Sequence, residues 1–208
     1  NQTEEHQALS AGVEALARWQ LGSRGWISPD QFIPLAVRHG LIDQLTDLVL
    51  RQSLAACGRW QRAGLETSIA VNAPISGMVD LKLPEMISQV CAEVGVNPQQ
   101  LTIEITETGL TDDEAGALDV LTRLRLRGVE LAIDDFGSGY STLRQLRRLP
   151  FTELKLDRSF VLASLDDDHA RSIVESAARL SGELGLRCVA EGVETRQHWQ
   201  LMADLGCD

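Results

Sequence analysis

The chain has 208 residues, 44% of them hydrophobic, and a formal net charge of −11. This length suffices to bury one full core, so we expect a single domain over residues 1–208. The acidic balance argues against a nucleic-acid duplex or an anionic membrane surface as the main partner, because such binding depends on basic groups. A negatively charged substrate is compatible with this charge where metal ions or a local arginine reverse the sign at the site.

The four cysteines, Cys57, Cys91, Cys188 and Cys207, form no Cys-x-x-Cys pair, and the four histidines are not spaced to complete a zinc site. This dispersal predicts reduced, mostly buried thiols. No apolar run approaches the roughly 20 residues of a membrane span, and no signal peptide is visible. We therefore expect a cytoplasmic domain, or the cytoplasmic part of a membrane-anchored protein, without membrane contact of its own.

After residues 1–11, which are polar and lack periodicity, short apolar strands alternate with amphipathic helices. Ser28 and Pro29 supply a cap and a first-turn proline for a helix that ends at Gly40. Further helices are predicted over 43–63, 78–94, 113–127, 141–148, 168–184 and 195–205, and strands over 12–19, 68–73, 101–105, 130–134, 152–156 and 187–191.

The strands are mostly apolar rather than alternating, which is typical of a parallel sheet covered on both faces. Successive strand–helix units with short connections predict an α/β fold, and we favour a (β/α)8 barrel of the TIM type. Six strands are visible where a closed barrel needs eight, so we expect its first and last strands to be absent from this chain through truncation. The alternative is a doubly wound open sheet, which gathers its ligands at one switch point.

Each of the six predicted strands ends on a polar or charged residue, a placement that a single switch point does not explain. In parallel barrels the carboxyl ends of the strands carry the active site. We therefore expect one site built from these strand-end residues: Glu14, Asn72, Glu104, Asp134 with Asp135, Lys155 and Glu191.

The chemistry of these residues points to metal ions. Glu14, Asn72, Glu104 and Asp134 offer oxygen ligands, which favour Mg²⁺ or Mn²⁺ over zinc. Asp135 follows Asp134 directly, so the pair could bridge to a second metal ion. Carboxylates crowded at one barrel mouth would otherwise repel one another or take up protons.

Lys155 and Glu191 are candidates for roles beyond binding the first metal ion. A lysine on a buried strand is costly unless it faces carboxylates, phosphate or water, so Lys155 would hold the attacking water or a phosphate oxygen, or form a structural ion pair. Glu191 is a candidate for acid–base work or for ligation of a second metal. The glycines that follow Asp135 predict a tight loop beside the acids, where phosphate would bind through metal ions rather than through the backbone alone.

A set of strings in this chain resembles the EAL domain family: GVEALARW, AVNA, EITE, DDFGSGYSTL, KLDRSF and AEGVET. They occur in the family's order and cover nearly the whole chain. Members of that family are TIM-barrel phosphodiesterases of bacterial second-messenger signalling that linearise cyclic di-GMP to pGpG. They use two Mg²⁺ or Mn²⁺ ions and are inhibited by Ca²⁺, and the resemblance implies the same for this chain.

The resemblance also implies roles for the strand-end residues. The first metal ion would be bound by Glu14, Asn72, Glu104 and Asp134, and the second by Asp135 with Asp134 shared. Of the remaining two, Glu191 matches the family's general base, and Lys155 matches a residue that helps to hold the catalytic water.

Other positions match residues around the family's site. Arg18 matches an arginine that contacts a substrate phosphate, and Leu16 a further substrate-contact position. Glu107 matches the glutamate that anchors the DDFG loop. Glu194 and Asp157 match supporting residues around the metal site.

The chain also departs from the family pattern. Asn72 is followed by Ala73 and Pro74 rather than by Leu-Ser, and Ser138 replaces a threonine. The family's Tyr-Gln-Pro-like and Gln-Gly-Tyr-like strings, from its first and last strands, are not found.

Family members commonly dimerise through the region after the DDFG strand and follow sensory or cyclase-like modules, so a homodimer and such a fusion are expected. One alternative is a catalytically inactive cyclic di-GMP receptor. Spacing alone also allows a different metal-dependent barrel enzyme, such as an isomerase or an enolase-like lyase, but the DDFGSGY loop and the EAL string exclude it. A purely structural domain would have little reason to keep Lys155 among acids.

Overall fold

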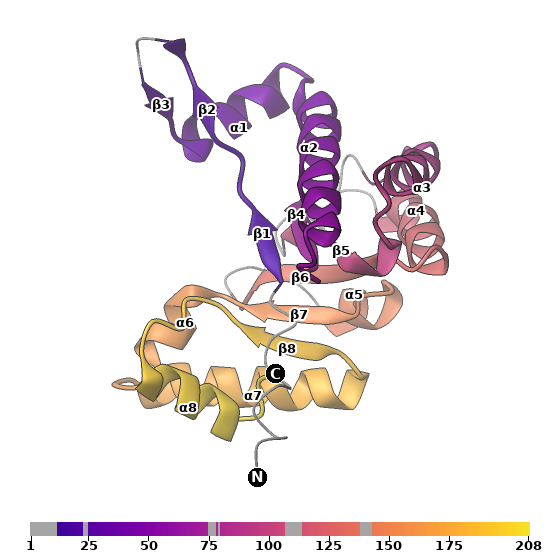
Figure 1. Ribbon diagram of the computed structural model, residues 1–208. Helices are drawn as coiled ribbons and strands as arrows, with labels where there is room; N and C mark the ends of the chain where they lie inside the picture. Colours follow the sequence, from indigo (N-terminus) through magenta and orange to yellow (C-terminus); the bar gives the residue numbers. More distant parts are fainter. Residues whose placement is uncertain (1–11, 23–24, 75–77, 79, 107–113, 138–142) are drawn as a thin grey trace.

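The computed structural model describes residues 12–22, 25–74, 78, 80–106, 114–137 and 143–208. Within these residues, six parallel strands form one curled sheet in the order β1-β4-β5-β6-β7-β8 (Figure 1). The strands are β1 (Val13–Ala15), β4 (Ile69–Asn72), β5 (Leu101–Thr106), β6 (Glu130–Phe136), β7 (Glu153–Leu156) and β8 (Arg187–Ala190).

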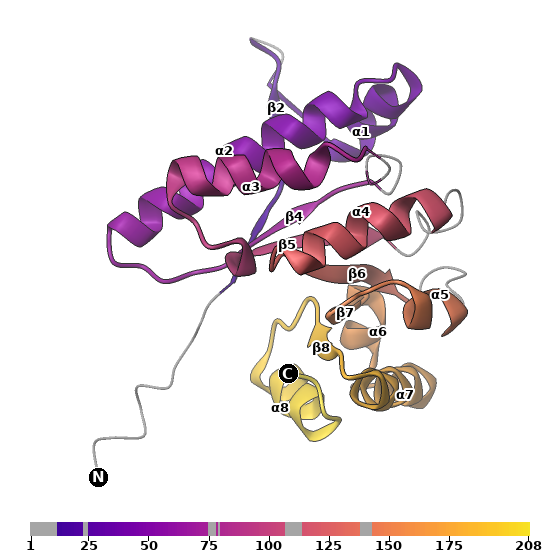
Figure 2. The same ribbon diagram turned by 90° about the vertical axis from the view of Figure 1, so that its right-hand side faces the viewer.

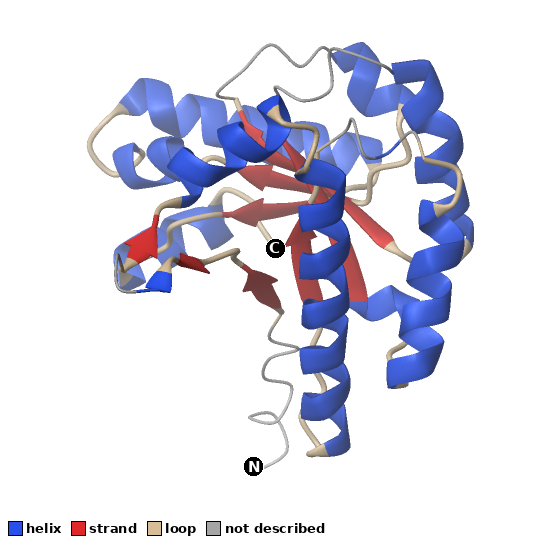
Figure 3. Cartoon of the chain, turned by 90° about the horizontal axis from the view of Figure 1, so that it is seen from above, coloured by secondary structure: helices blue, strands red, loops and turns tan. Residues whose placement is uncertain are grey.

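The strand order decides between the two architectures that the sequence allows. Neighbours in the sheet follow one another along the chain, with only the small hairpin of β2 (Trp19–Gln20) and β3 (Trp26–Ile27) set apart. A doubly wound sheet instead reverses its order at a switch point, so that alternative is excluded. The curled sheet with its helices outside is the predicted partial TIM-type barrel (Figure 3).

Helices cover the outer face of the sheet (Figure 2). Apolar residues between the two layers form a continuous core that includes Leu50 on α2, Leu121 on α4 and Val174 on α7. None of the helices that the structure describes is long and apolar enough to cross a membrane. The helices are α1 (Pro29–Arg38), α2 (Ile42–Arg62), α3 (Leu83–Val94), the short η3 (Pro98–Gln100), α4 (Glu114–Leu126), α5 (Leu143–Arg148), α6 (Arg158–Ala163), α7 (Asp168–Leu184) and α8 (Arg196–Asp204).

The inner face of the central strands carries the polar residues that the sequence predicted for the site. On β5, the fully buried Ile103 and Ile105 belong to the core under the helices. Glu104 lies between them and contacts Lys155 of β7, which also reaches Asp134 of β6. Because successive side chains of a strand point to opposite faces, these polar residues line the concave side. The sheet is thus apolar toward the helices, and the predicted site residues Glu104, Asp134 and Lys155 line its inner face.

Three elements of the structure differ from the prediction for local reasons. The strand predicted over 12–19 ends at Ala15, and Trp19 pairs with Ile27 in the hairpin. The helix predicted from residue 78 begins at Leu83, because Pro84 is tolerated only in the first turn, where no N–H bond is lost. The short helix α6, which was not predicted, begins after Asp157, whose side chain caps it.

The packing of α2 against α3 can be tested at Gly58. A Cβ atom at this position would lie 2.5 Å from the carbonyl oxygen of Val94, whereas a Cβ at Gly182 in α7 would meet no atom within 4 Å. We expect Gly58→Ala to lower the free energy of unfolding by about 1–3 kcal/mol, because the helices must move apart. Gly182→Ala should raise it by roughly 0.5–1 kcal/mol, the usual advantage of alanine in a helix. Urea unfolding measures both, and equal effects would contradict the close approach.

Candidate metal centre and active site

The carboxyl ends of the parallel strands bring the predicted residues to one end of the half-barrel. In the strand register, Asn72 at the end of β4 lies beside Glu104 of β5. Thr106 at the end of β5 lies beside Asp134 of β6. Because all these strands run in the same direction, their polar ends share one edge of the sheet.

Lys155 joins three of these strand ends. Its Nζ atom lies 2.6 Å from Oε1 of Glu104, 2.6 Å from Oε1 of Glu191 and 3.4 Å from Oδ1 of Asp134. The side chains of Lys155 and Glu104 are only 7% and 2% exposed. The ammonium group therefore serves as a structural ion-pair partner of three acids.

Burial and charge act in opposite directions on these groups. Burial alone would lower the pKa of Lys155, but the charge of Glu104 and hydrogen bonds to Glu104 and Glu191 hold that pKa above its ordinary value. Burial raises the pKa of Glu104 to about 7 despite the attraction of Lys155, and burial also raises the pKa of Glu191. Burial, with the charge of Asp134, raises the pKa of Asp135 to about 6. These acids outnumber the single lysine, so bound cations would relieve the excess of negative charge.

One buried oxygen of the cluster lacks a partner. The Oε2 atom of Glu104 is buried and has no hydrogen bond within the described part of the chain. Such an atom is costly unless an ion or a water satisfies it. Next to it on the sheet, the amide nitrogen of Asn72 donates to Oε1 of Glu14 at 2.6 Å, which leaves the amide oxygen of Asn72 for a cation. Glu14, Asn72, Glu104 and Asp134 therefore fit a hard divalent cation with oxygen ligands.

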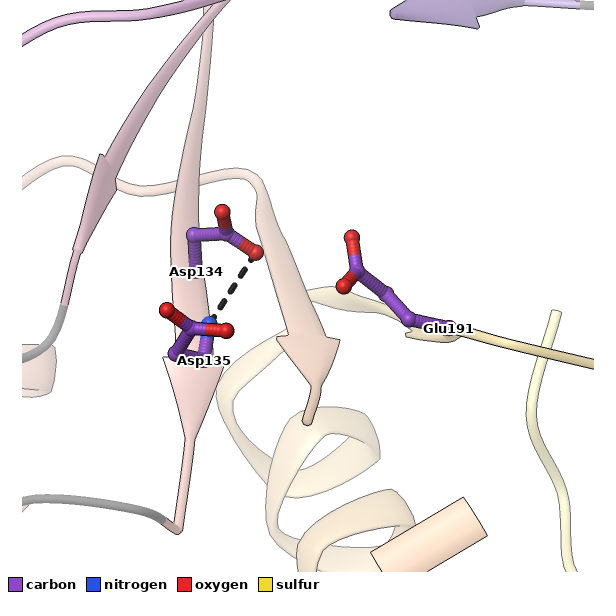
Figure 4. A group of neighbouring side chains, drawn as sticks. All are labelled: Asp134, Asp135 and Glu191. Carbon is purple, nitrogen blue, oxygen red and sulfur yellow. Dashed lines mark hydrogen bonds between the residues drawn. The ribbon is translucent and has the colours of Figure 1, made fainter. Parts of the chain in front are cut away.

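A second group of acids that could hold a cation lies between β6 and β8. One ligand oxygen each of Asp134, Asp135 and Glu191 lie within 4.8 Å of one another, and Figure 4 shows Asp134 and Asp135 on β6 across from Glu191. Neighbouring residues of a regular strand point to opposite faces. Here Asp135 has a φ of 56°, its amide donates to Oδ1 of Asp134 at 3.0 Å, and the pairing of β6 with β7 shifts register at this point. This bulge lets both carboxylates reach the same site.

Asp157 connects this second position to α6. Its side chain accepts a hydrogen bond from the Ser159 amide at 2.8 Å as the helix cap, and it also hydrogen-bonds to the carboxyl group of Asp135. The structure therefore places Asp157 in contact with a predicted metal ligand, where a supporting residue would act.

The chain after Glu191 turns sharply at Gly192, which has a φ of 70°. A Cβ atom there would clash with the side chain of Arg158 on α6. Arg158 in turn pairs with the exposed Glu194 at 2.5 Å. Glu194 therefore contacts α6 rather than the three-carboxylate cluster, and any support that it gives to the site is indirect. Glu107 lies outside the described residues.

Arg18 and Leu16 line a pocket beside the cluster. The pocket has a volume of about 300 Å³ and includes Asn72, Pro74 and Thr106 in its lining, so it adjoins the first cation position. A larger pocket of about 660 Å³ shares Leu16 and Arg18 but is otherwise lined mainly from α1 and α2, without any of the predicted metal ligands. The smaller pocket is the better place for a substrate, because it includes the predicted metal ligand Asn72.

Sequence patterns missed two features of this site. Pro29 and Ile33 of α1 line the smaller pocket. Apolar residues at helical spacing give the same pattern in a core and in a pocket wall, so no sequence signal separates them. The left-handed backbone of Asp135 also has no signal, because contacts from the surrounding structure maintain such a conformation in a residue other than glycine.

Comparison with known proteins identifies the family. The family model described as the EAL domain matches residues 7–208, so the chain belongs to the EAL domain family. The solved structure of the PaMucR phosphodiesterase in its c-di-GMP complex superposes with a TM-score of 0.86 and 37% identity, over 95% of this chain and 80% of that one.

Two curated relatives have similar coverage. An uncharacterized protein of Azorhizobium caulinodans is 41% identical over 95% of this chain and 28% of its own length. The cyclic di-GMP phosphodiesterase PA2567 of Pseudomonas aeruginosa is 37% identical over 94% of this chain and 33% of its own length. The chain thus spans about a third or less of these relatives.

The raised pKa of Glu104 predicts that the free energy of unfolding of the metal-free protein decreases as the pH rises. The folded pKa of about 7 lies above the ordinary value of 4.5, so stability is lost as pH rises from about 4.5 to 7 and the group ionises. Glu104→Gln imitates the protonated side chain. We expect this variant, in a chelator, to melt at a higher temperature than wild type at pH 8 and at nearly the same temperature at pH 5. Lower stability of the variant at pH 8 would contradict this account.

The same variant tests cation binding. Millimolar Mg²⁺ or Mn²⁺ should raise the melting temperature of the wild type, because a ligand of the folded state stabilises it. Glu104→Gln should lose most of that rise. Glu153→Gln is the matched control: Glu153 is also a buried acid with a pKa raised by burial, but it lies at the opposite end of β7 and pairs with Arg187. An equal loss in both variants would argue against a cation at Glu104.

Proposed function

We propose that this domain is a metal-dependent phosphodiesterase that hydrolyses cyclic di-GMP to linear pGpG. The observation that carries the proposal is the buried contact of Lys155 with Glu104, Asp134 and Glu191. The last two of these acids also form a three-carboxylate cluster with Asp135. Membership of the EAL domain family and the names of the relatives support the choice of substrate.

The cofactors that we propose are two Mg²⁺ or Mn²⁺ ions. Every candidate ligand offers oxygen, and these two ions favour oxygen ligands. Ca²⁺ should compete for the same positions and inhibit, because it is larger and prefers more ligands in a looser geometry. When bound, a pair of such ions lowers the pKa of a water molecule and offsets charge on the phosphate.

The residues of the chain supply the rest of the reaction. The Lys155 ammonium, kept charged by its three carboxylate neighbours, donates to the attacking water or to a phosphate oxygen. Glu191 accepts the proton of the water at its carboxylate, and its raised pKa brings its basicity nearer to neutral pH. Arg18, on the wall of the smaller pocket, binds a phosphate oxygen of the substrate.

We also propose the neighbouring domains, the location and the oligomeric state. The relatives are much longer than this chain, which supports a natural protein with sensory or cyclase-like modules beside this domain. The proposed location is cytoplasmic, where cyclic di-GMP is found. A homodimer that uses the region after β6 stays a prediction, because that region includes residues 138–142, which lie outside the described part of the chain.

Glu191→Gln tests the proposed base. We expect the rate of pGpG formation to fall at least about 100-fold, since a positioned base contributes roughly 10²–10⁴-fold, while cyclic di-GMP still binds. Chromatography of the nucleotides measures the rate, and calorimetry measures binding. Glu194→Gln is the matched control, because it removes an exposed acid of the same loop that pairs with Arg158, and it should cost less than about tenfold.

Two outcomes would contradict the proposal. A Glu191→Gln variant with nearly the rate of wild type would remove Glu191 from the reaction. Wild-type protein that binds cyclic di-GMP in Mg²⁺ without forming pGpG would instead favour the receptor function.

A further inference from the structure

Two cysteines outside the catalytic cluster lie against each other. Cys188 on β8 and Cys207, which follows α8, have their Sγ atoms 3.9 Å apart. Cys188 is 1% exposed, and Cys207 is half-buried. The other two cysteines, Cys57 on α2 and Cys91 on α3, are both buried in the layer of helices that covers the sheet.

Backbone contacts hold the two thiols in this position. The Asp208 amide donates to the Cys188 carbonyl at 2.8 Å, and the Cys188 amide donates to Oδ2 of Asp208 at 2.7 Å. The Cys207 amide donates to the carbonyl of Met202 on α8 at 2.9 Å. The two cysteines are therefore neighbours across adjacent segments, a placement from which a disulfide needs only a small approach of the side chains.

We propose that Cys188 and Cys207 are a redox modification site that forms a reversible disulfide by exchange with a low-molecular-weight disulfide such as oxidised glutathione. The bond would fasten the segment after α8 to β8, the strand that ends next to Glu191. This inference does not depend on the proposed hydrolysis.

The exchange proceeds in two balanced steps. In the first, the thiolate of the half-buried Cys207 attacks one sulfur of glutathione disulfide, forms a mixed disulfide and releases one glutathione. In the second, Sγ of Cys188 attacks Sγ of Cys207, breaks the mixed bond and releases the second glutathione. The two cysteine protons end on the two released thiols, so the cysteines are oxidised by two electrons and one glutathione disulfide is reduced.

The contact between the two thiols shifts their pKa values in opposite directions. A hydrogen bond with Cys207, together with one to Ser181, lowers the pKa of Cys188 more than burial raises it, whereas the hydrogen bond with Cys188 and burial raise the pKa of Cys207. A thiolate is the attacking form in disulfide exchange. Accessibility, not pKa, makes Cys207 the first point of attack, because Cys188 is buried away from a bulky oxidant and Cys207 is only half-buried.

Peptide mapping in glutathione buffers tests the site. The purified protein is equilibrated from fully reducing to fully oxidising ratios, the free thiols are blocked, and the digest is read by mass spectrometry without reduction. We expect a Cys188–Cys207 linked peptide, loss of two of the four thiols and full reversal by dithiothreitol. The oxidised protein should also melt at a higher temperature, because the bond restricts the unfolded chain.

Variants separate this pair from the other thiols. Cys57→Ser/Cys91→Ser should keep both the linked peptide and the thermal shift, and Cys207→Ser should lose both. Cys188→Ser should trap glutathione on Cys207, because the second step is blocked. If Cys188→Ser does not fold, Cys207→Ser still tests the proposal, because Cys207 is only half-buried. The proposal is overturned by free Cys188 and Cys207 under oxidising buffer, by linkage of either to Cys57 or Cys91, or by an unchanged thermal shift in Cys207→Ser.

Discussion

The contact of one buried ammonium group with three carboxylates is the constraint on which the site depends. Lys155 can be almost fully buried only because Glu104, Asp134 and Glu191 surround it. Removing charges from water costs several kcal/mol each, and close ion pairing offsets that cost only where the geometry is good. Parallel strands supply this geometry, because they place the ends of β5, β6 and β7 and the residue after β8 at one edge of the sheet.

The same cluster contains more negative charge than Lys155 can balance. Burial keeps the pKa of Glu104 and Asp135 above their ordinary values, and one oxygen of Glu104 has no partner in the described part of the chain. An arrangement of this kind reduces the stability of the empty site and increases its affinity for cations, which is the usual relation between stability and function at active sites. The β-bulge at Asp135 increases this negative charge, because it turns a second carboxylate onto the inner face.

Different elements of the fold form the charged cluster and the smaller pocket beside it. Strands β5 to β7 and the residue after β8 hold the ionised groups around Lys155, and β1 and β4 add Glu14 and Asn72. Helices α1 and α2 supply most of the apolar wall of the smaller pocket near Leu16 and Arg18. The chain between β8 and Cys207 forms a third unit, in which α8 and the residues after it pack back on the strand next to Glu191. A covalent link in that unit would therefore act on the support of the site and not on its ligands.

The sequence by itself determined the order of strands and helices, the polar residue at each strand end and the oxygen character of the ligands, because each of these depends on local pattern. It also indicated the family through six short strings. Only the tertiary structure decided that Lys155 contacts three acids, that Asp135 turns onto the same face as Asp134, that Glu194 pairs with Arg158, and that Cys188 meets Cys207. Those contacts join residues that are distant in the chain or depend on a locally strained backbone. Spacing along a sequence predicts neither a long-range contact nor a strained backbone.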